Sequence, residues 1–185
     1  KIKLGLLIVC FALMIWGFFI EPSLLTQRNL KLNHWLGSPL KIAFFSDLHA
    51  GAPHINREYI DRLIDRINAM SPDLILIGGD IVINGVVGGE PIPIESVALQ
   101  LRKLKAPLGV YAVLGNHDWW NDGPKIQSVL ESNGIVVLEN KARLVRNGTN
   151  SSFWLVGIGD AYTNHANIDQ ALSEITSEAS QILFM

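Results

Sequence analysis

The stretch KIAFFSDLH, residues 41–49, shows the pattern that decides the fold. An apolar run, Leu40–Phe45, ends in the polar cluster Ser46-Asp47-Leu48-His49. Short apolar runs bounded by turn residues are typical of buried strands. The pattern occurs twice more, as Leu74–Ile77 followed by Gly78-Gly79-Asp80 and as Val110–Leu114 followed by Gly115-Asn116-His117-Asp118. We therefore predict three buried strands, each with polar residues at its carboxyl end.

The segments between these strands have the periodicity of amphipathic helices. Asn56–Met70 carries apolar residues at the spacing of one helix face, namely Ile60, Leu63, Ile64 and Ile67. A second helix is expected to bury Val97, Leu101 and Leu104 and to end at residues 107–109, and a third is expected between Pro124 and Gly134. Strands that alternate with helices predict an α/β fold, a layered sheet with helices packed on it.

The last third of the chain predicts a hairpin and one more helix. Ile135–Leu138 is a further strand candidate, and Lys141–Val145 and Phe153–Ile158 flank the turn signal Asn147-Gly148. Asn167 and Gln170 have the spacing of a capping box. The helix that they open is expected to turn Ile168, Leu172 and Ile175 inward.

The three polar clusters are expected to meet at one sheet edge, because ligands of open α/β sheets bind outside the carboxyl ends of the strands. Asp47 and Asp80 are 33 residues apart and Asp80 and Asn116 are 36 apart, which suits one strand-helix-strand unit each. The carboxylates, imidazoles and amide of the clusters fit two divalent metal ions, Mn²⁺, Fe or Zn²⁺, with Asp80 on the middle strand as the bridge. For each residue alone, ordinary turn polarity is the alternative.

These ordered motifs, D-x-H at 47–49, G-D at 79–80 and G-N-H-D at 115–118, resemble those of the calcineurin-like metallophosphoesterase superfamily. The resemblance extends from about Leu40 to the end, and within the superfamily it is greatest to small bacterial membrane-associated phosphoesterases. It implies a two-layer sheet sandwich flanked by helices. It also implies that Asp47 and His49 bind a first metal ion, that Asp80 bridges both ions and that Asn116 binds the second.

The implied reaction is hydrolysis of phosphoester or phosphodiester bonds by a water molecule that two metal ions activate. His117 would protonate the leaving oxygen, with Asp118 as its orienting partner. The family pattern has two further features downstream, a histidine after a later strand and a G-H-x-H motif. This chain contains neither of them. Because the chain also opens with Lys1 and closes within the apolar run Ile182–Met185, we interpret it as a piece of a longer protein. The alternative function is an inactive metal-binding or scaffolding module.

Leu4–Ile20 is an apolar segment of 17 residues without a charge, and a membrane-spanning helix needs about 17–25 such residues. It has neither the polar face of a core helix nor the cleavage site of a signal peptide. We predict a membrane anchor over residues 1–22, a linker over 23–39 and the incomplete phosphoesterase domain over 40–185. Lys1 and Lys3 precede the span, which favours a domain outside a bacterial inner or plasma membrane.

The residues around the motifs bear on the substrate. Trp119 and Trp120 follow the last cluster and either form an apolar wall for a lipid-linked phosphoester or pack their loop onto the domain. The net charge is −2. Because phosphate contacts dominate nucleic-acid affinity, this charge disfavours a nucleic-acid substrate.

Overall fold

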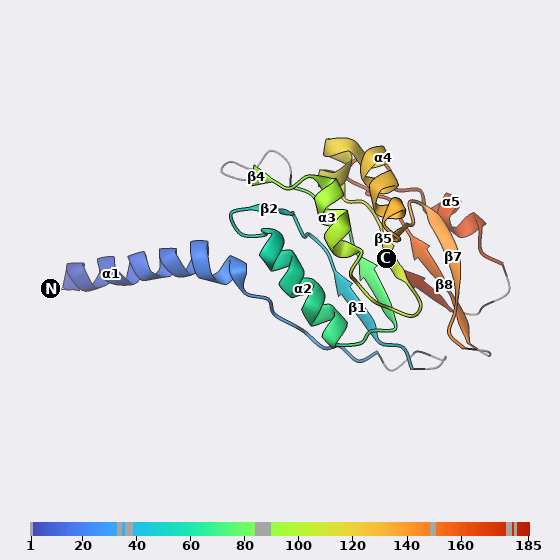
Figure 1. Ribbon diagram of the computed structural model, residues 1–185, viewed down its shortest axis with the longest axis horizontal. Helices are drawn as coiled ribbons and strands as arrows, with labels where there is room; N and C mark the ends of the chain where they lie inside the picture. The colour runs from blue at the N-terminus through green and yellow to red at the C-terminus, as the bar shows by residue number, and fades with distance from the viewer. Residues whose placement is uncertain are drawn as a thin grey trace.

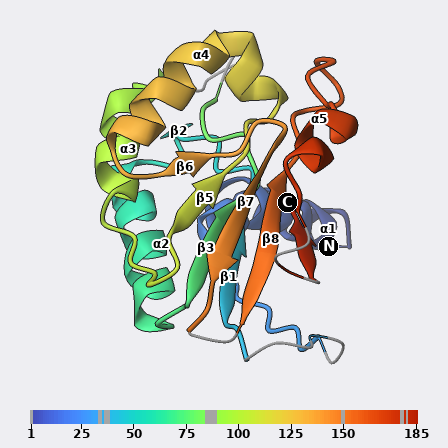
Figure 2. The same ribbon diagram turned by 90° about the vertical axis from the view of Figure 1, so that its right-hand side faces the viewer.

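The structure is a computed structural model, and it describes residues 2–32, 35, 39–83, 90–148, 151–176, 179 and 181–185. Two β-sheets lie face to face, with helices on the outer face of each (Figures 1 and 2). This layered α/β arrangement confirms the predicted sheet sandwich flanked by helices. An apolar helix at the N-terminus projects away from the layers (Figure 1).

The larger sheet contains the three strands that carry the polar clusters. Its order is β1 (Ile42–Phe45), β3 (Leu74–Ile77), β5 (Val110–Ala112) and β6 (Val136–Val137), and all neighbours pair in parallel. The connections between them contain α2 (Arg57–Ala69), α3 (Ile94–Leu101) and α4 (Asn116–Ser132), which cover one face of the sheet (Figure 2). Because the strands are parallel, the three clusters leave the sheet at the same edge.

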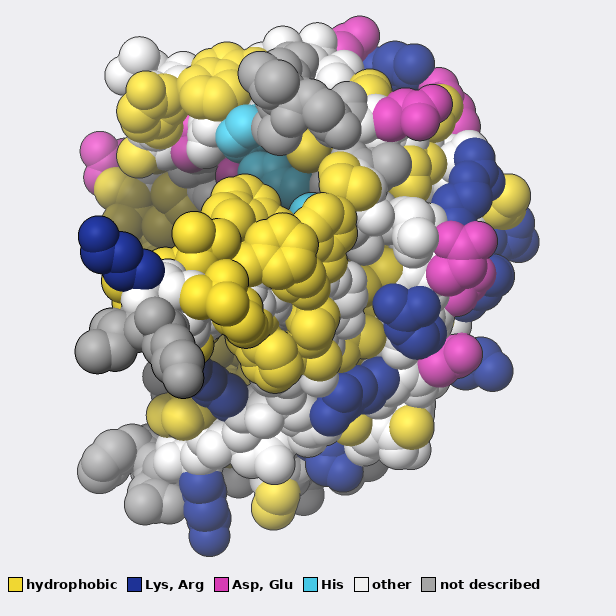
Figure 3. Space-filling model, turned by 90° about the vertical axis from the view of Figure 1, so that its left-hand side faces the viewer, with side chains coloured by type: hydrophobic (Ala, Val, Ile, Leu, Met, Phe, Trp, Pro, Cys, Tyr) yellow, Lys and Arg dark blue, Asp and Glu magenta, His cyan; other side chains and the backbone are white. Residues whose placement is uncertain are grey.

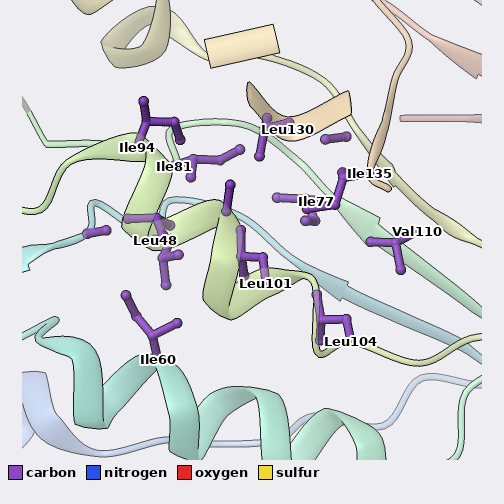
Figure 4. Packing of buried hydrophobic residues seen from close by; sticks show 14 of the residues in the cluster. Leu48, Ile60, Ile77, Ile81, Ile94, Leu101, Leu104, Val110, Leu130 and Ile135 are labelled. Carbon is purple, nitrogen blue, oxygen red and sulfur yellow. The ribbon is translucent and has the colours of Figure 1, made fainter. Parts of the chain in front are cut away.

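The main hydrophobic core lies between this sheet and its helices. Figure 4 shows Ile60 of α2 and Leu101 of α3 among the side chains that gather against the strands. Ile60, Ile64 and Ile67 are buried as the periodicity predicted, and Leu63 is partly buried. Leu104 is also buried, although it lies beyond the end of α3.

The second sheet consists of β7 (Lys141–Arg146), β8 (Ser152–Gly157) and β9 (Ile182–Phe184), in that order. β7 and β8 form the predicted antiparallel hairpin, and β9 pairs in parallel with β8. Successive residues of a strand point to opposite faces. Phe153 and Leu155 accordingly pack in the core between the sheets, whereas Trp154 and Val156 pack with α5 (Ile168–Ser173). A short ribbon of β2 (Gly51–Ala52) and β4 (Glu90–Pro91) lies beyond β1.

α4 begins eight residues before Pro124, where the sequence predicted a helix. Asp118, at its third position, accepts the N–H of Gly115 at 3.0 Å, and this capping bond starts the helix at Asn116. The helix is interrupted at Asp122 (φ −167°, ψ 80°), whose Oδ1 accepts the N–H of Lys125 at 3.1 Å. The predicted segment is thus the second part of a broken helix, and the G-N-H-D residues occupy its first turn.

The predicted inward face of the last helix is confirmed only in part, because Ile175 packs against the same cluster as α5 and Ile168 does not. The cap of α5 is as expected, because Oδ1 of Asn167 accepts the N–H of Gln170 at 3.0 Å. Ile168, however, is 50% exposed, and the buried residue is Ala171. The small side chain of Ala171 lets this six-residue helix approach Trp154 closely.

The apolar N-terminal segment is helical. α1 (Ile2–Ile15) continues through a π-helical turn, η1 (Trp16–Ile20), and a 3-10 turn, η2 (Glu21–Ser23). The stretch Lys3–Ser23 is long and apolar enough to cross a membrane, and its most apolar part is not buried in the molecule. This segment is therefore not a core helix, although a signal sequence would pass the same test of length and composition.

Replacing Leu101 with alanine is expected to lower the free energy of unfolding by about 2–5 kcal/mol, because the change leaves a cavity in the core. Leu99 of the same helix is the matched control, since it is 59% exposed and Leu101 is fully buried. Leu99→Ala should cost about 0.5 kcal/mol or less. Urea unfolding of the full chain in detergent, followed by tryptophan fluorescence, measures both. Equal losses of unfolding free energy in the two variants would contradict the packing of α3.

Candidate functional site

The ends of β1, β3 and β5 bring the three polar clusters together, as predicted. Hydrogen bonding continues past the strands: the N–H of Asp47 donates to the carbonyl of Gly79 at 3.0 Å, and that of His49 to the carbonyl of Asp80 at 2.9 Å. Seen from the side to which α1 projects, histidine side chains are visible on the surface (Figure 3). The carboxyl ends of the strands of the larger sheet therefore gather the candidate residues in one place.

His49, Asp80 and His117 form a compact group in which one ligand atom of each lies within 4.8 Å of the others. Nε2 of His49 is 3.8 Å from Oδ1 of Asp47 and 3.9 Å from Oδ2 of Asp80, so the imidazole lies between two carboxylates. The rings of His49 and His117 meet edge to face, with 4.6 Å between their centroids. The ligand atoms of one tetrahedral Zn²⁺ lie about 3.3–3.6 Å from one another. The donor types therefore fit a divalent cation, and the group is compact enough for the three side chains to reach one ion.

Two glycines allow the loops to approach closely enough to form this group. A Cβ atom on Gly79 would lie 2.5 Å from the backbone nitrogen of Gly115, and one on Gly115 would lie 2.2 Å from Oδ1 of Asp80. Gly79 also has a φ of +91°, which side-chain-bearing residues rarely adopt. The N–H of His117 donates to that same Oδ1 at 2.9 Å, so the Asp80 carboxylate is oriented with its other oxygen toward His49.

The backbone is strained at three of the predicted ligands. Asp47, His49 and Asp80 have φ values of 54°, 45° and 53°. Positive φ is uncommon outside glycine, and such residues cluster at functional sites, where the surrounding structure holds them. In addition, the hydroxyl of Ser46 donates to Oδ2 of Asp47. The local backbone is thus shaped to place these side chains.

Asn116 and His117 occupy the first turn of α4, and both are partly buried. Nδ1 of His117 is buried and has no hydrogen-bond partner among the described residues. The structure therefore places both residues at the site. The metal-ligand role of Asn116 and the acid role of His117 stay predictions.

Asp118 is fully buried, and its carboxylate is bonded to the backbone of two loops. Oδ1 accepts the N–H groups of Ile81 at 2.9 Å and Val82 at 3.1 Å, and Oδ2 accepts that of Gly115 at 3.0 Å. Burial raises the pKa of this carboxyl, the three N–H groups oppose the rise, and the charge of Asp80 adds to it. These contacts differ from the orienting contact with His117 that the resemblance implies.

Sequence reasoning missed Glu139, although it follows β6 and the rule of carboxyl strand ends applies to it as well. Its Oε1 accepts the N–H of Leu114 at 2.7 Å, directly before the G-N-H-D residues. Its Oε2 is buried and unpartnered within the described part of the chain. Burial raises the pKa of Glu139, the Leu114 N–H opposes this, and the charges of Asp118 and Asp160 add to the rise.

The two tryptophans of α4 take different environments. Trp119 stacks on His165, with 3.5 Å between ring centroids, and packs against the main core. Trp120 is 51% exposed, and its ring lies 5.0 Å from that of His117 and 5.6 Å from that of Tyr162. The packing alternative therefore holds for Trp119, and Trp120 lies beside the site.

Glu139→Gln is expected to stabilise the folded chain, relative to the natural chain, increasingly as the pH rises from the ordinary pKa of a glutamate through the raised pKa of Glu139. Because the pKa of Glu139 is raised above its ordinary value of 4.5 by folding, ionisation costs more in the folded than in the unfolded state. The natural chain therefore loses stability as the pH rises through this interval, and glutamine, which does not ionise, avoids the loss. Urea unfolding at several pH values measures the difference, with the exposed Glu131→Gln as control. A difference that does not change with pH would contradict the raised pKa.

Comparison with known proteins agrees with this geometry. A transmembrane protein with a metallophosphoesterase domain from Danio rerio is 30% identical over 78% of this chain. The uncharacterized metallophosphoesterase YkuE of Bacillus subtilis is 28% identical over 90% of the chain, and the UDP-2,3-diacylglucosamine pyrophosphatase LpxG of Chlamydia trachomatis is 33% identical over 57%. The chain spans 34%, 59% and 32% of the lengths of these three relatives. The family model for calcineurin-like phosphoesterases matches residues 40–181, a range that includes all three polar clusters, so the chain belongs to this family.

Proposed function

We propose that this chain carries the two-metal site of a phosphoesterase that hydrolyses phosphoester or phosphodiester bonds. The observation that supports the proposal is the convergence of His49, Asp80 and His117 from three separate strand ends. Asp47 and His49 would hold one ion, Asn116 the other, and Asp80 would lie between them. The oxygen and nitrogen donors suit Mn²⁺, Fe or Zn²⁺.

The residues divide the chemistry between them. Divalent ions bound here would activate water and neutralise charge on the phosphoryl oxygens. We assign His117 as the general acid: its imidazolium gives a proton to the leaving oxygen and becomes neutral, an effect of typically about 10²–10⁴-fold. Because His117 also belongs to the compact ligand group, direct metal binding is its alternative role. Asp118 would act as a positioning residue through the loop backbones that it holds.

We further propose that α1 anchors the protein in a membrane and that the substrate is a lipid-linked phosphoester. The membrane-length apolar helix supports the anchor, and Lys1 and Lys3 before it support an extracytoplasmic domain. One relative is named a pyrophosphatase of UDP-2,3-diacylglucosamine, whose name describes a diacylated substrate. The net charge of −2 still disfavours a nucleic-acid substrate.

Asp80→Asn is expected to abolish Mn²⁺-dependent hydrolysis of bis(p-nitrophenyl) phosphate and to weaken Mn²⁺ binding, because the amide removes the charge that two ions would share. Asp65→Asn, at an exposed position of α2, is the matched control and should change neither. Calorimetric titration of the chain with Mn²⁺ measures binding. Hydrolysis is measured on the chain and on any longer product of its gene.

The outcomes separate the two functions that the sequence left open. Metal-dependent hydrolysis that is lost in Asp80→Asn supports the enzyme. Metal binding without hydrolysis, in the longer product as well, supports the metal-binding or scaffolding module. Hydrolysis that needs no metal, or that persists in Asp80→Asn, refutes the assignment of this site.

A further inference from the structure

The apolar helix projects from the side of the molecule on which the candidate site opens. In Figure 1, α1 extends to the left, and β2 and β4 lie above it on the left side of the domain. β2 directly follows His49, so this is the side of the carboxyl strand ends. Figure 3 views that side: the hydrophobic side chains in the middle of the view are in front, where α1 points toward the viewer, and histidine side chains are visible behind them.

The linker accounts for this direction. β1 begins at the opposite end of the sheet, and the described linker residues 24–32 run back along the domain toward it (Figure 1). Nη1 of Arg66, on α2, donates to the carbonyl of Leu25 at 2.7 Å, and residues 25–29 lie beside β1 and α2. The linker is therefore bound to the domain close to the point where the helix leaves it.

Exposed aromatic rings extend outward from the site in a row. Trp120 follows His117 by one helical turn, at 5.0 Å between centroids, and Tyr162 follows Trp120 at 5.6 Å. Trp120 is 51% exposed and Tyr162 is 75% exposed. These two residues, which we term the aromatic rim, connect the proposed acid to the surface.

The surrounding residues hold the aromatic rim outward. The stacking of Trp119 on His165 fixes the start of α4, so that the next residue, Trp120, points away from the core. Tyr162 lies in a turn closed by Asp160, whose Oδ2 accepts the N–H of Thr163 at 2.6 Å and its hydroxyl at 2.7 Å. The N–H of His165 completes the turn by donating to the carbonyl of Asp160 at 2.9 Å. The exposure of both rings is thus a property of the folded structure.

Tryptophan and tyrosine have a preferred place beside an apolar helix. Their rings concentrate at the membrane interface, where the apolar body contacts acyl chains and the polar N–H or O–H stays with the headgroups. Single exposed apolar residues are ordinary on soluble proteins. Here two adjacent exposed aromatic residues lie beside the candidate site in a chain that also has a helix of membrane-spanning length, and this combination points to a lipid surface.

We infer that the aromatic rim of Trp120 and Tyr162 contacts the interface of the bilayer that α1 crosses, so that the site receives its substrate from the lipid surface. The inference rests on the proposed anchoring and deepens the proposed function. It defines the substrate class as a phosphoester whose apolar part stays in the membrane while its phosphate reaches Asp80 and His117. A soluble planar ligand that stacks on the same rings is the competing occupant.

A fluorescent label at Tyr162 tests the contact. The full chain carrying Cys10→Ser and Tyr162→Cys is labelled with nitrobenzoxadiazole and placed in phosphatidylcholine–phosphatidylglycerol nanodiscs. The matched control is Lys105→Cys, an exposed position before β5 at the opposite sheet edge. We expect blue-shifted emission and several-fold stronger quenching by headgroup spin-labelled lipid at position 162 than at 105. Equal quenching at the two positions, or a response at 162 to adenosine monophosphate and none to lipid, would overturn the inference.

Intrinsic fluorescence provides a second measurement that leaves Tyr162 unchanged. Brominated phosphatidylcholine should quench a smaller fraction of the emission after Trp120→Phe than in the natural chain, whereas Trp154→Phe, at a position only 7% exposed, should not lower the quenched fraction. No decrease for Trp120→Phe would count against the rim. Neither measurement requires turnover. Lipid contact without metal binding would support the contact of the aromatic rim and refute the proposed phosphoesterase function. Metal-dependent hydrolysis without lipid contact would support the phosphoesterase function and refute the contact of the rim.

Discussion

The carboxylate of Asp118 accepts backbone N–H groups from Ile81, Val82 and Gly115, and so binds the loop after β3 to the start of α4. The loop after β1 joins the same network, because the N–H of Ala50 donates to the carbonyl of Ile81 at 2.9 Å. A buried carboxyl is costly unless it is hydrogen-bonded, and this arrangement of loops supplies three donors. The relative positions of the candidate ligands therefore depend on Asp118, whose carboxylate oxygens accept backbone N–H groups.

Much of the fold could be predicted because it follows from local periodicity and parallel pairing. Ile60, Ile64 and Ile67 mark the buried face of α2, and the run Leu74–Ile77 marks a strand buried on both faces. Once the strands are parallel and joined by helices, their polar ends must share an edge, which is why Asp47, Asp80 and the G-N-H-D residues could be grouped in advance.

The rest depends on contacts between distant residues that no periodicity encodes. The hydrogen bonds of Asp118 to Ile81 and Val82 cross 37 and 36 residues, and Trp120 meets Tyr162, which lies in the turn after β8. α4 has two capping residues: Asp118 at its start and Asp122 where it is interrupted. The sequence alone does not show that both caps belong to one broken helix. Glu139 is different, since its place after a fourth strand made it predictable.

The linker shows how an anchored site can face its membrane. Residues 24–41 are 18 residues, which extended at about 3.3 Å per residue reach about 60 Å, far more than the roughly 13 Å length of a four-residue strand such as β1. Length alone therefore leaves the direction of α1 open, and the bond from Arg66 to Leu25 restricts it. A chain with a net charge of −2 has little long-range attraction for an anionic phosphoester. In the proposed anchored protein, holding the site against a surface that carries the substrate would replace that attraction, because the search would then be confined to the plane of the membrane.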